Sequence, residues 1–312
     1  MNKTALLFAG QGAQVVGMGN DLAAAFPSAR AWFDRANATL GYDLAAICFN
    51  GPEAELTRTE NTQPGIFLVS WVAFQLLKER VPALKFEATA GLSLGEFTAL
   101  TAAGAMSFED GLRVVRQRGR CMQEASEATR GSMAAIIGLD EARVREVCAE
   151  AGVELANLNC PGQIVISGEL EKIDHARQLA RAKGAKKALP LPVAGAYHSR
   201  LMAGAQTKLQ AALAGVPFQP PSVTVISNVT ARPHGSVMET QAMLVRQVTA
   251  SVRWEESMGY LLAQGFTRFV ELGPGTALSG FMKRIDKNAR MFSVADAPSL
   301  EETVKSVEAW ER

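Results

Sequence analysis

The chain has 312 residues, of which 48% are hydrophobic and 20% are charged, and its formal net charge is +1. This near-neutral balance disfavours a nucleic-acid-binding protein, which normally carries a concentrated basic excess. No apolar run reaches the roughly 18 residues of a membrane-spanning helix. The first residues do not resemble a signal peptide, because glycine and glutamine follow directly on the apolar run 5–9. We therefore expect a globular cytoplasmic protein that binds neither nucleic acid nor membrane.

The four cysteines are spread along the chain, at Cys48, Cys121, Cys148 and Cys160. No pair has the C-x-x-C spacing of a zinc or redox site, and the pattern does not suggest a disulfide framework. We therefore expect no metal site, no bound cofactor and a reducing environment.

A short apolar run at residues 4–9, TALLFA, predicts a buried strand, and a loop containing Gly10, Gln11 and Gly12 follows it. The two glycines suggest a dinucleotide or phosphate loop, but a third glycine three residues on and a Gly-Lys-Ser/Thr sequence are both missing. The remaining interpretation is a tight loop whose backbone approaches another part of the molecule closely, with Gln11 at its tip.

Helical turns alternate with loops over residues 21–40 and 52–58, and a longer helix is predicted after them. Thr62 is its predicted N-cap, and Pro64 is placed in its first turn. The run IFLVSWVAFQLLKER at residues 66–80 is apolar on most faces, which indicates a helix buried on most of its surface.

The stretch 88–103, ATAGLSLGEFTALTAA, carries the strongest functional signal in the chain. Glycines two positions before and after Ser93 predict a nucleophile elbow, in which a strained strand-to-helix turn exposes the serine hydroxyl. The free backbone N–H groups at the start of the following helix suit an oxyanion. The alternative is an ordinary turn bracketed by Gly91 and Gly95 that happens to contain a serine. The strand before it and the helix after it favour the elbow.

A helix is predicted over residues 107–125, with a serine as its N-cap and acidic residues in its first turn. Arg113, Arg116 and Arg120 recur on it at spacings of three and four residues and therefore share one face, which is typical of a solvated basic surface. Arg118 lies off that stripe, so we expect its side chain to point elsewhere.

Residues 131–193 show strand and helix patterns in the order βαββαβ, which is that of a ferredoxin-like domain. The chain on both sides of this unit has the pattern of a larger α/β body. We therefore predict an α/β-hydrolase-like catalytic body formed by residues 1–128 and 198–312. A ferredoxin-like subdomain is predicted to be inserted into it at residues 129–197.

A serine nucleophile needs a general base, and the chain has three histidines. His175 lies in a polar amphipathic helix and is expected at the surface, and His234 lies in a turn and is expected to be exposed. His198 follows the last strand of the inserted unit, where the chain returns to the body, and is the predicted base. No acidic residue lies near it in the sequence, so a backbone or amide oxygen is the alternative partner for its imidazole.

Eight segments, taken in order, resemble the malonyl-CoA:acyl carrier protein transacylases over nearly the whole chain. They are FAGQGAQ, TENTQPGIF, GLSLGE, RQRGRCMQ, NCPGQIVISG, GAYHSRLM, RQVTASVRW and ELGPGTALSGFMKRI.

The resemblance implies a Ser–His dyad of Ser93 and His198. It also implies an oxyanion hole from the backbone N–H groups of Gln11 and Leu94, and Arg118 as partner of the malonyl carboxylate. Gln247 corresponds to the residue whose carbonyl orients the histidine, which would explain the missing aspartate.

Three features depart from the family pattern. Leu92 stands where the family usually has histidine, which changes the packing of the elbow but not the implied proton transfer. Ala9 stands where proline is frequent. Tyr197 precedes the base where malonyl-selective modular polyketide relatives have phenylalanine in His-Ala-Phe-His, and this bulky aromatic favours malonyl over a branched group.

The predicted function is a ping-pong acyltransferase. It moves a malonyl group from malonyl-CoA to the phosphopantetheine thiol of an acyl carrier protein, for fatty acid synthesis or for a polyketide synthase in trans. One alternative is a serine hydrolase or thioesterase, which usually orders serine, acid and a histidine near the C-terminus. The other is an inactive carrier-protein docking module, which the presence of Ser93, His198 and Arg118 disfavours. No dimerisation signal is seen, so a monomer is expected.

Overall fold

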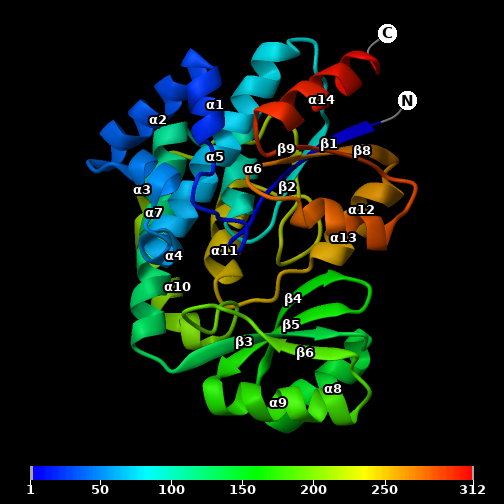
Figure 1. The fold of residues 1–312 in the computed structure, drawn as a ribbon. Coiled ribbons are helices and arrows are strands. Elements are labelled where there is room, and N and C mark those ends of the chain that lie inside the picture. The colour runs from blue at the N-terminus through cyan, green and yellow to red at the C-terminus, as the bar shows by residue number, and fades with distance from the viewer. Residues whose placement is uncertain (1–2, 311–312) are drawn as a thin grey trace.

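Two β-sheets organise the molecule, each with its own helical cover (Figure 1). The computed structural model describes residues 3–310, and within them the larger sheet has five parallel strands in the order β7-β2-β1-β8-β9. These strands are β1 (Lys3–Phe8), β2 (Ala88–Gly91), β7 (Thr224–Val225), β8 (Phe266–Leu272) and β9 (Arg290–Val294).

The central strand β1 is buried on both faces, as expected for a parallel strand with helices on each side. Its side chains alternate between two cores: Ala5 and Leu7 pack with Trp254 and Met258 of α12, whereas Leu6 and Phe8 belong to the larger core. The predicted strand at residues 4–9 is confirmed within one residue at each end.

The helices of the body divide between the two faces of the sheet (Figure 1). Those contributing to the larger core include α1 (Asn20–Ala25), α2 (Pro27–Leu40), α3 (Leu44–Asn50), α4 (Glu53–Thr57), α5 (Thr59–Arg80), α6 (Gly95–Ala102), α7 (Phe108–Glu127), α10 (Ala203–Ala214), α11 (Val237–Gln247) and α14 (Ala297–Glu308). The opposite face is covered by α12 (Trp254–Ala263) and α13 (Ala277–Ile285). A 3-10 helix over Arg200–Met202 precedes α10.

The smaller sheet is antiparallel, in the order β4-β5-β3-β6, and two helices cover one of its faces. Its elements are β3 (Gly131–Ile137), α8 (Glu141–Ala151), β4 (Glu154–Cys160), β5 (Gln163–Glu169), α9 (Leu170–Ala182) and β6 (Lys187–Pro190). This is the predicted ferredoxin-like βαββαβ unit, and the predicted two-part α/β fold is confirmed. Along β3, Ala134 and Ile136 face the two helices, whereas Met133 and Ala135 join the core of the body.

The predicted start of α5 is wrong. The helix begins at Thr59, and Thr62 lies inside it with its hydroxyl donating to the carbonyl of Leu56. The backbone N–H of Thr59 instead donates to the side chain of Gln123 on α7, 3.0 Å away. A tertiary contact therefore satisfies the helix end, which removes the need for a cap from its own sequence.

Candidate active site

The turn between β2 and α6 has the geometry of a nucleophile elbow. Ser93 lies in the left-handed region with φ of 54°, which a non-glycine residue adopts only when its surroundings hold it there. A Cβ atom on Gly91 would lie 1.9 Å from the carbonyl oxygen of Gly95, and one on Gly95 would lie 2.3 Å from that of Phe8. Both glycines are therefore required by the close approach of the turn to itself and to β1.

The loop after β1 packs directly against this elbow. A Cβ atom on Gly10 would lie 2.5 Å from the carbonyl oxygen of Leu92, so the backbone approach predicted for this loop is made to the nucleophile turn. Within residues 3–310, neither the N–H of Gln11 nor that of Leu94 donates to another backbone or side-chain acceptor. Both groups are thus free to bind a ligand.

Ser93 and His198 lie within hydrogen-bonding distance although 105 residues separate them. The Ser93 hydroxyl is 2.9 Å from Nε2 of the imidazole, and His198 itself has φ of 58°. On the other side of the ring, Nδ1 donates to the carbonyl oxygens of Gln247 at 2.9 Å and Ala250 at 3.1 Å. Two backbone acceptors require a proton on Nδ1, which leaves the Nε2 lone pair facing the serine.

The imidazole of His198 is neutral at physiological pH. Burial, with a further contribution from the neighbouring positive charge of Arg118, lowers the pKa of His198 to about 4. A neutral imidazole whose Nε2 accepts from a hydroxyl is the form that a general base needs.

Arg118 occupies the position that its helical spacing predicts. Its side chain is buried, whereas Arg113, Arg116 and Arg120 on the same helix are exposed. The Nη1 group donates to Oε1 of Gln63 at 2.7 Å. Burial lowers the pKa of Arg118 to about 10, partly offset by nearby negative charge, so the guanidinium remains a cation at neutral pH.

This cation points at the nucleophile. The Nη2 group of Arg118 donates to the hydroxyl of Ser93 at 3.0 Å and to Oε1 of Gln247 at 2.9 Å. Its Nε atom is buried and has no hydrogen-bond partner within residues 3–310. Arg118 is thus a buried cation beside Ser93 that keeps one N–H group unpaired within the described residues.

A cavity of about 410 Å³ opens above Ser93 and His198, between the body and the inserted sheet. The body contributes Gln11, Leu92 and Met122 to its wall, and the small subdomain contributes apolar side chains of β3 and β5 together with Asn159 of β4. Tyr197 also lines it, and its hydroxyl lies 2.7 Å from that of Thr59.

Among residues 3–310, no group of three or more His, Cys, Asp and Glu side chains is placed to hold a metal ion. Over the same residues, no helix is long and apolar enough to cross a membrane.

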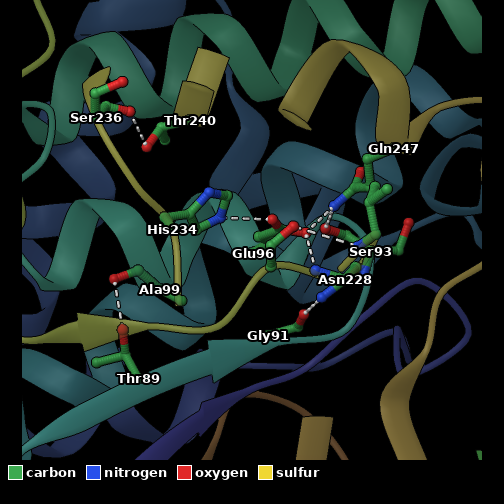
Figure 2. Close-up of polar contacts among 12 residues, drawn as sticks. Thr89, Gly91, Ser93, Glu96, Ala99, Asn228, His234, Ser236, Thr240 and Gln247 are labelled. Atoms are coloured by element: carbon green, nitrogen blue, oxygen red, sulfur yellow. Dashed lines mark hydrogen bonds and ion pairs between the residues drawn. The ribbon is translucent and has the colours of Figure 1, made fainter. Parts of the chain in front are cut away.

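Beneath the elbow lies a polar network that sequence reasoning missed (Figure 2). The prediction for His234 is wrong: its side chain is fully buried, and Nε2 lies 2.7 Å from Oε1 of Glu96. Asn228 accepts from the N–H of Ser93 and donates to the carbonyl oxygen of Gly91, so it ties the two sides of the turn together. The signal in the sequence was Glu96 itself, a single acid within an otherwise buried, largely apolar helix.

Fold and site together define an α/β protein in which a serine in a strained strand-to-helix turn lies beside a histidine, with a second subdomain over both. The sequence profile of the acyl transferase domain matches residues 5–308. The malonyl CoA-acyl carrier protein transacylase of Bacillus subtilis is 42% identical over 312 residues, which cover 98% of each protein. The chain therefore belongs to the acyl transferase family.

Solved structures of this family are close to the present one. The malonyl CoA-acyl carrier protein transacylase of Coxiella burnetii has a TM-score of 0.95 at 35% identity, covering 98% of both chains. A malonyl-transacylase solved with its type II polyketide synthase acyl carrier protein has a TM-score of 0.94 at 38% identity. That match covers 98% of this chain and 100% of the other.

Proposed function

We propose that the protein transfers a malonyl group from malonyl-CoA to the phosphopantetheine thiol of an acyl carrier protein, through an ester on Ser93. The transacylase relatives support the overall reaction. The observation that carries the choice of acyl group is the buried guanidinium of Arg118, 3.0 Å from the Ser93 hydroxyl. A site that keeps a cation out of water beside its nucleophile favours an acyl group that brings a carboxylate.

In the first half-reaction, His198 Nε2 takes the proton of Ser93 as Oγ attacks the thioester carbonyl carbon. The N–H groups of Gln11 and Leu94 stabilise the oxyanion of the tetrahedral intermediate. The C–S bond then breaks, and the proton passes from His198 to the departing CoA sulfur. The product is malonyl-Ser93 and free CoA.

The second half-reaction runs in reverse with a different thiol. The phosphopantetheine thiol of the carrier protein gives its proton to His198 and attacks the ester carbonyl. The C–O bond to Ser93 breaks, and the serine recovers its proton from the imidazole. One base thus serves both halves of a ping-pong cycle.

Arg118 selects the acyl group through its distance from the ester. In malonyl-Ser93 only one methylene separates the ester carbonyl from the carboxylate, so the carboxylate must lie close to the guanidinium. The planar guanidinium binds a carboxylate with two parallel hydrogen bonds. Tyr197 and Leu92 line the same cavity and limit the volume available to a branched group.

Hydrolysis is the less favoured alternative. Within residues 3–310, the hydrogen bonds of His198 Nδ1 go only to two backbone carbonyls, where serine hydrolases usually place an acid. Asp174, a possible acid for such a triad with His198, pairs instead with Arg177 at 2.7 Å on the exposed face of α9. An inactive docking module is disfavoured by the geometry of the serine, the imidazole and the guanidinium.

Residues 1–128 and 198–312 form the catalytic body, and residues 129–197 form the inserted subdomain that closes one side of the cavity. The protein acts as a cytoplasmic monomer that uses malonyl-CoA as substrate and needs no bound cofactor.

Intact-mass spectrometry after mixing with malonyl-CoA tests the proposal directly. We expect one malonyl group per chain, its loss on addition of a phosphopantetheinylated carrier protein, and no adduct in Ser93→Ala. A Ser93→Ala protein that still gains a malonyl group would contradict the assignment. Rapid loss of the group to water without carrier would favour the hydrolase.

A further inference from the structure

The carboxylate of Glu96 lies in α6 one turn after the nucleophile and is fully buried. Three N–H donors surround it (Figure 2). His234 Nε2 is 2.7 Å from Oε1, and Oε2 accepts from Gln247 Nε2 at 2.6 Å and from the backbone N–H of Asn228 at 3.1 Å. Neither Glu96 nor His234 is among the residues that line the cavity.

His234 donates to the carboxylate of Glu96 through Nε2. Nε2 of His234 must hold a proton because it faces a carboxylate, which only accepts. Nδ1 of the same ring is buried and has no partner within residues 3–310. Glu96 also favours the charged form of the buried Arg118 guanidinium, which partly offsets the lowering of its pKa by burial.

The carboxylate fixes which way the amide of Gln247 points. Because Glu96 accepts only, Gln247 must turn Nε2 toward it, and the same Nε2 also donates to the carbonyl oxygen of Ser93 at 2.9 Å. This leaves Oε1 of Gln247 facing Nη2 of Arg118 at 2.9 Å. In the opposite orientation, Oε1 of Gln247 would face the carboxylate oxygen of Glu96, and two acceptors would meet. The amide N–H groups of Gln247 would then face the N–H groups of Arg118, and two donors would meet.

We propose that Glu96 and His234 form a positioning pair that acts through the Gln247 amide to hold the Arg118 guanidinium at the nucleophile. In this role the pair sets the preference for a carboxylate-bearing acyl group. The inference rests on the proposed function, because it gives Arg118 its role as carboxylate anchor. This positioning role can be distinguished from a purely structural one. Loss of a structural support would lower the transfer of every acyl group equally. Loss of the Glu96–His234 pair should instead lower the transfer of a carboxylate-bearing acyl group most.

The test uses two replacements of His234 that leave α6 untouched. Glutamine places an N–H group where the imidazole has Nε2, whereas phenylalanine keeps the ring volume and removes the donor. The measurement is the rate of Ser93 acylation by malonyl-CoA and by acetyl-CoA in single turnovers, expressed as the ratio of the two rates.

We expect His234→Phe to lower the malonyl-to-acetyl ratio by about 3- to 10-fold and His234→Gln to leave it near the wild-type value. Glu96→Gln, which removes the charge, is expected to lower the ratio by at least about 10-fold. Thr89→Val is the control: Thr89 is buried nearby and donates to the carbonyl of Ala99, and within residues 3–310 no hydrogen bond joins its side chain to the network, so the ratio stays unchanged. Circular dichroism melting of each variant reports whether it is folded.

The outcomes distinguish a failure of the proposed function from a failure of the positioning role of Glu96 and His234. A wild-type protein that acylates equally fast from both donors would contradict the Arg118 anchor, and therefore the proposed function and this inference together. A wild-type preference for malonyl that persists unchanged in His234→Phe would overturn the inference alone. If Glu96→Gln does not fold, the two His234 variants still decide the question.

Discussion

Nη2 of Arg118 lies 3.0 Å from Oγ of Ser93, so the group proposed to bind the substrate carboxylate also contacts the proposed nucleophile. The same guanidinium contributes to the low pKa of His198. Binding of a carboxylate would neutralise that charge beside the base. Substrate recognition and base strength are therefore coupled through one side chain.

Arg118→Ala is expected to lower kcat/KM for malonyl-CoA by roughly 10² to 10³, which corresponds to about 3 to 4 kcal/mol of lost pairing. Acetyl-CoA should gain in relative terms, because the pocket no longer holds an unpaired cation. Arg118→Lys should recover only part of the malonyl activity, since an ammonium lacks the bidentate geometry. Steady-state kinetics with both donors measure this. An unchanged ratio would show that Arg118 is not the carboxylate anchor.

His198→Ala is expected to slow acyl transfer by at least about 100-fold, the low end for a positioned acid–base group. Asp174→Asn tests whether Asp174 acts as the acid of a triad with Ser93 and His198. We expect almost no change in the transfer rate, because Asp174 pairs with Arg177 on α9. Transfer rates to the carrier protein measure both. A loss of activity in the Asp174 variant would revive the triad and with it the hydrolase.

The rate of acylation should depend on pH through His198. Because its pKa is lowered to about 4, kcat/KM for acetyl-CoA should stay flat down to about pH 5 and fall only as pH approaches 4. Acetyl-CoA is the right donor, since it has no carboxyl group that titrates in this range. In Arg118→Ala the fall in kcat/KM should begin at a higher pH, because the positive charge of Arg118 no longer lowers the pKa of His198. A fall near the ordinary 6.5 in the wild type would contradict the burial of the base.

The same pKa shift affects stability. The unfolded chain takes up a proton on this histidine below 6.5, whereas the folded chain does so only near 4. The contribution of His198 to stability is therefore fully present above pH 6.5 and is lost as pH falls toward 4. Urea unfolding of wild type and His198→Ala across this range should show a smaller pH dependence in the variant.

Gly91→Ala should prevent the elbow from forming, because the new Cβ would lie 1.9 Å from the carbonyl oxygen of Gly95. We expect a loss of about 3 kcal/mol or more in the free energy of unfolding, together with loss of acylation. Gly204→Ala is the control. Gly204 lies in α10 with no atom near the position of a new Cβ, so alanine there should stabilise the protein by about 0.5 to 1 kcal/mol. Equal stabilities for the two variants would contradict the steric argument.

An acidic carrier protein should be attracted by the basic end of α13. Lys283 in the last turn of α13 and Lys287 just after the helix are both exposed, and α13 contributes Leu278 and Phe281 to the cavity wall. Reversing both lysines to glutamate should slow the second half-reaction about 5-fold or more at low salt and reduce its salt dependence.

Lys186 and Lys187, two exposed lysines at the start of β6, provide the comparison when they receive the same charge change. Stopped-flow rates of malonyl transfer at several ionic strengths measure both variants. Rates that do not vary with salt in the wild type would remove electrostatic steering altogether.

Much of this architecture follows from local pattern. The apolar run of β1, the βαββαβ order of residues 131–193 and the glycines around Ser93 each reflect rules that act over a few residues. The helical period placed Arg118 away from Arg113, Arg116 and Arg120, and the structure buries Arg118 alone among them. These features were predictable because backbone sterics and the spacing of side chains on an element do not depend on distant partners.

The contacts beneath the site depended on tertiary structure. Thr59 needed no cap of its own because Gln123 of α7 supplies an acceptor. His234 lies in a turn, where exposure is the ordinary expectation, yet the fold brings its ring onto Glu96, 138 residues earlier in the chain. A buried carboxylate must be satisfied by donors, and only the packing of α6 against the loop and α11 determines which donors reach it. The sequence therefore determines which donors and acceptors are available, and the tertiary structure determines which of them pair.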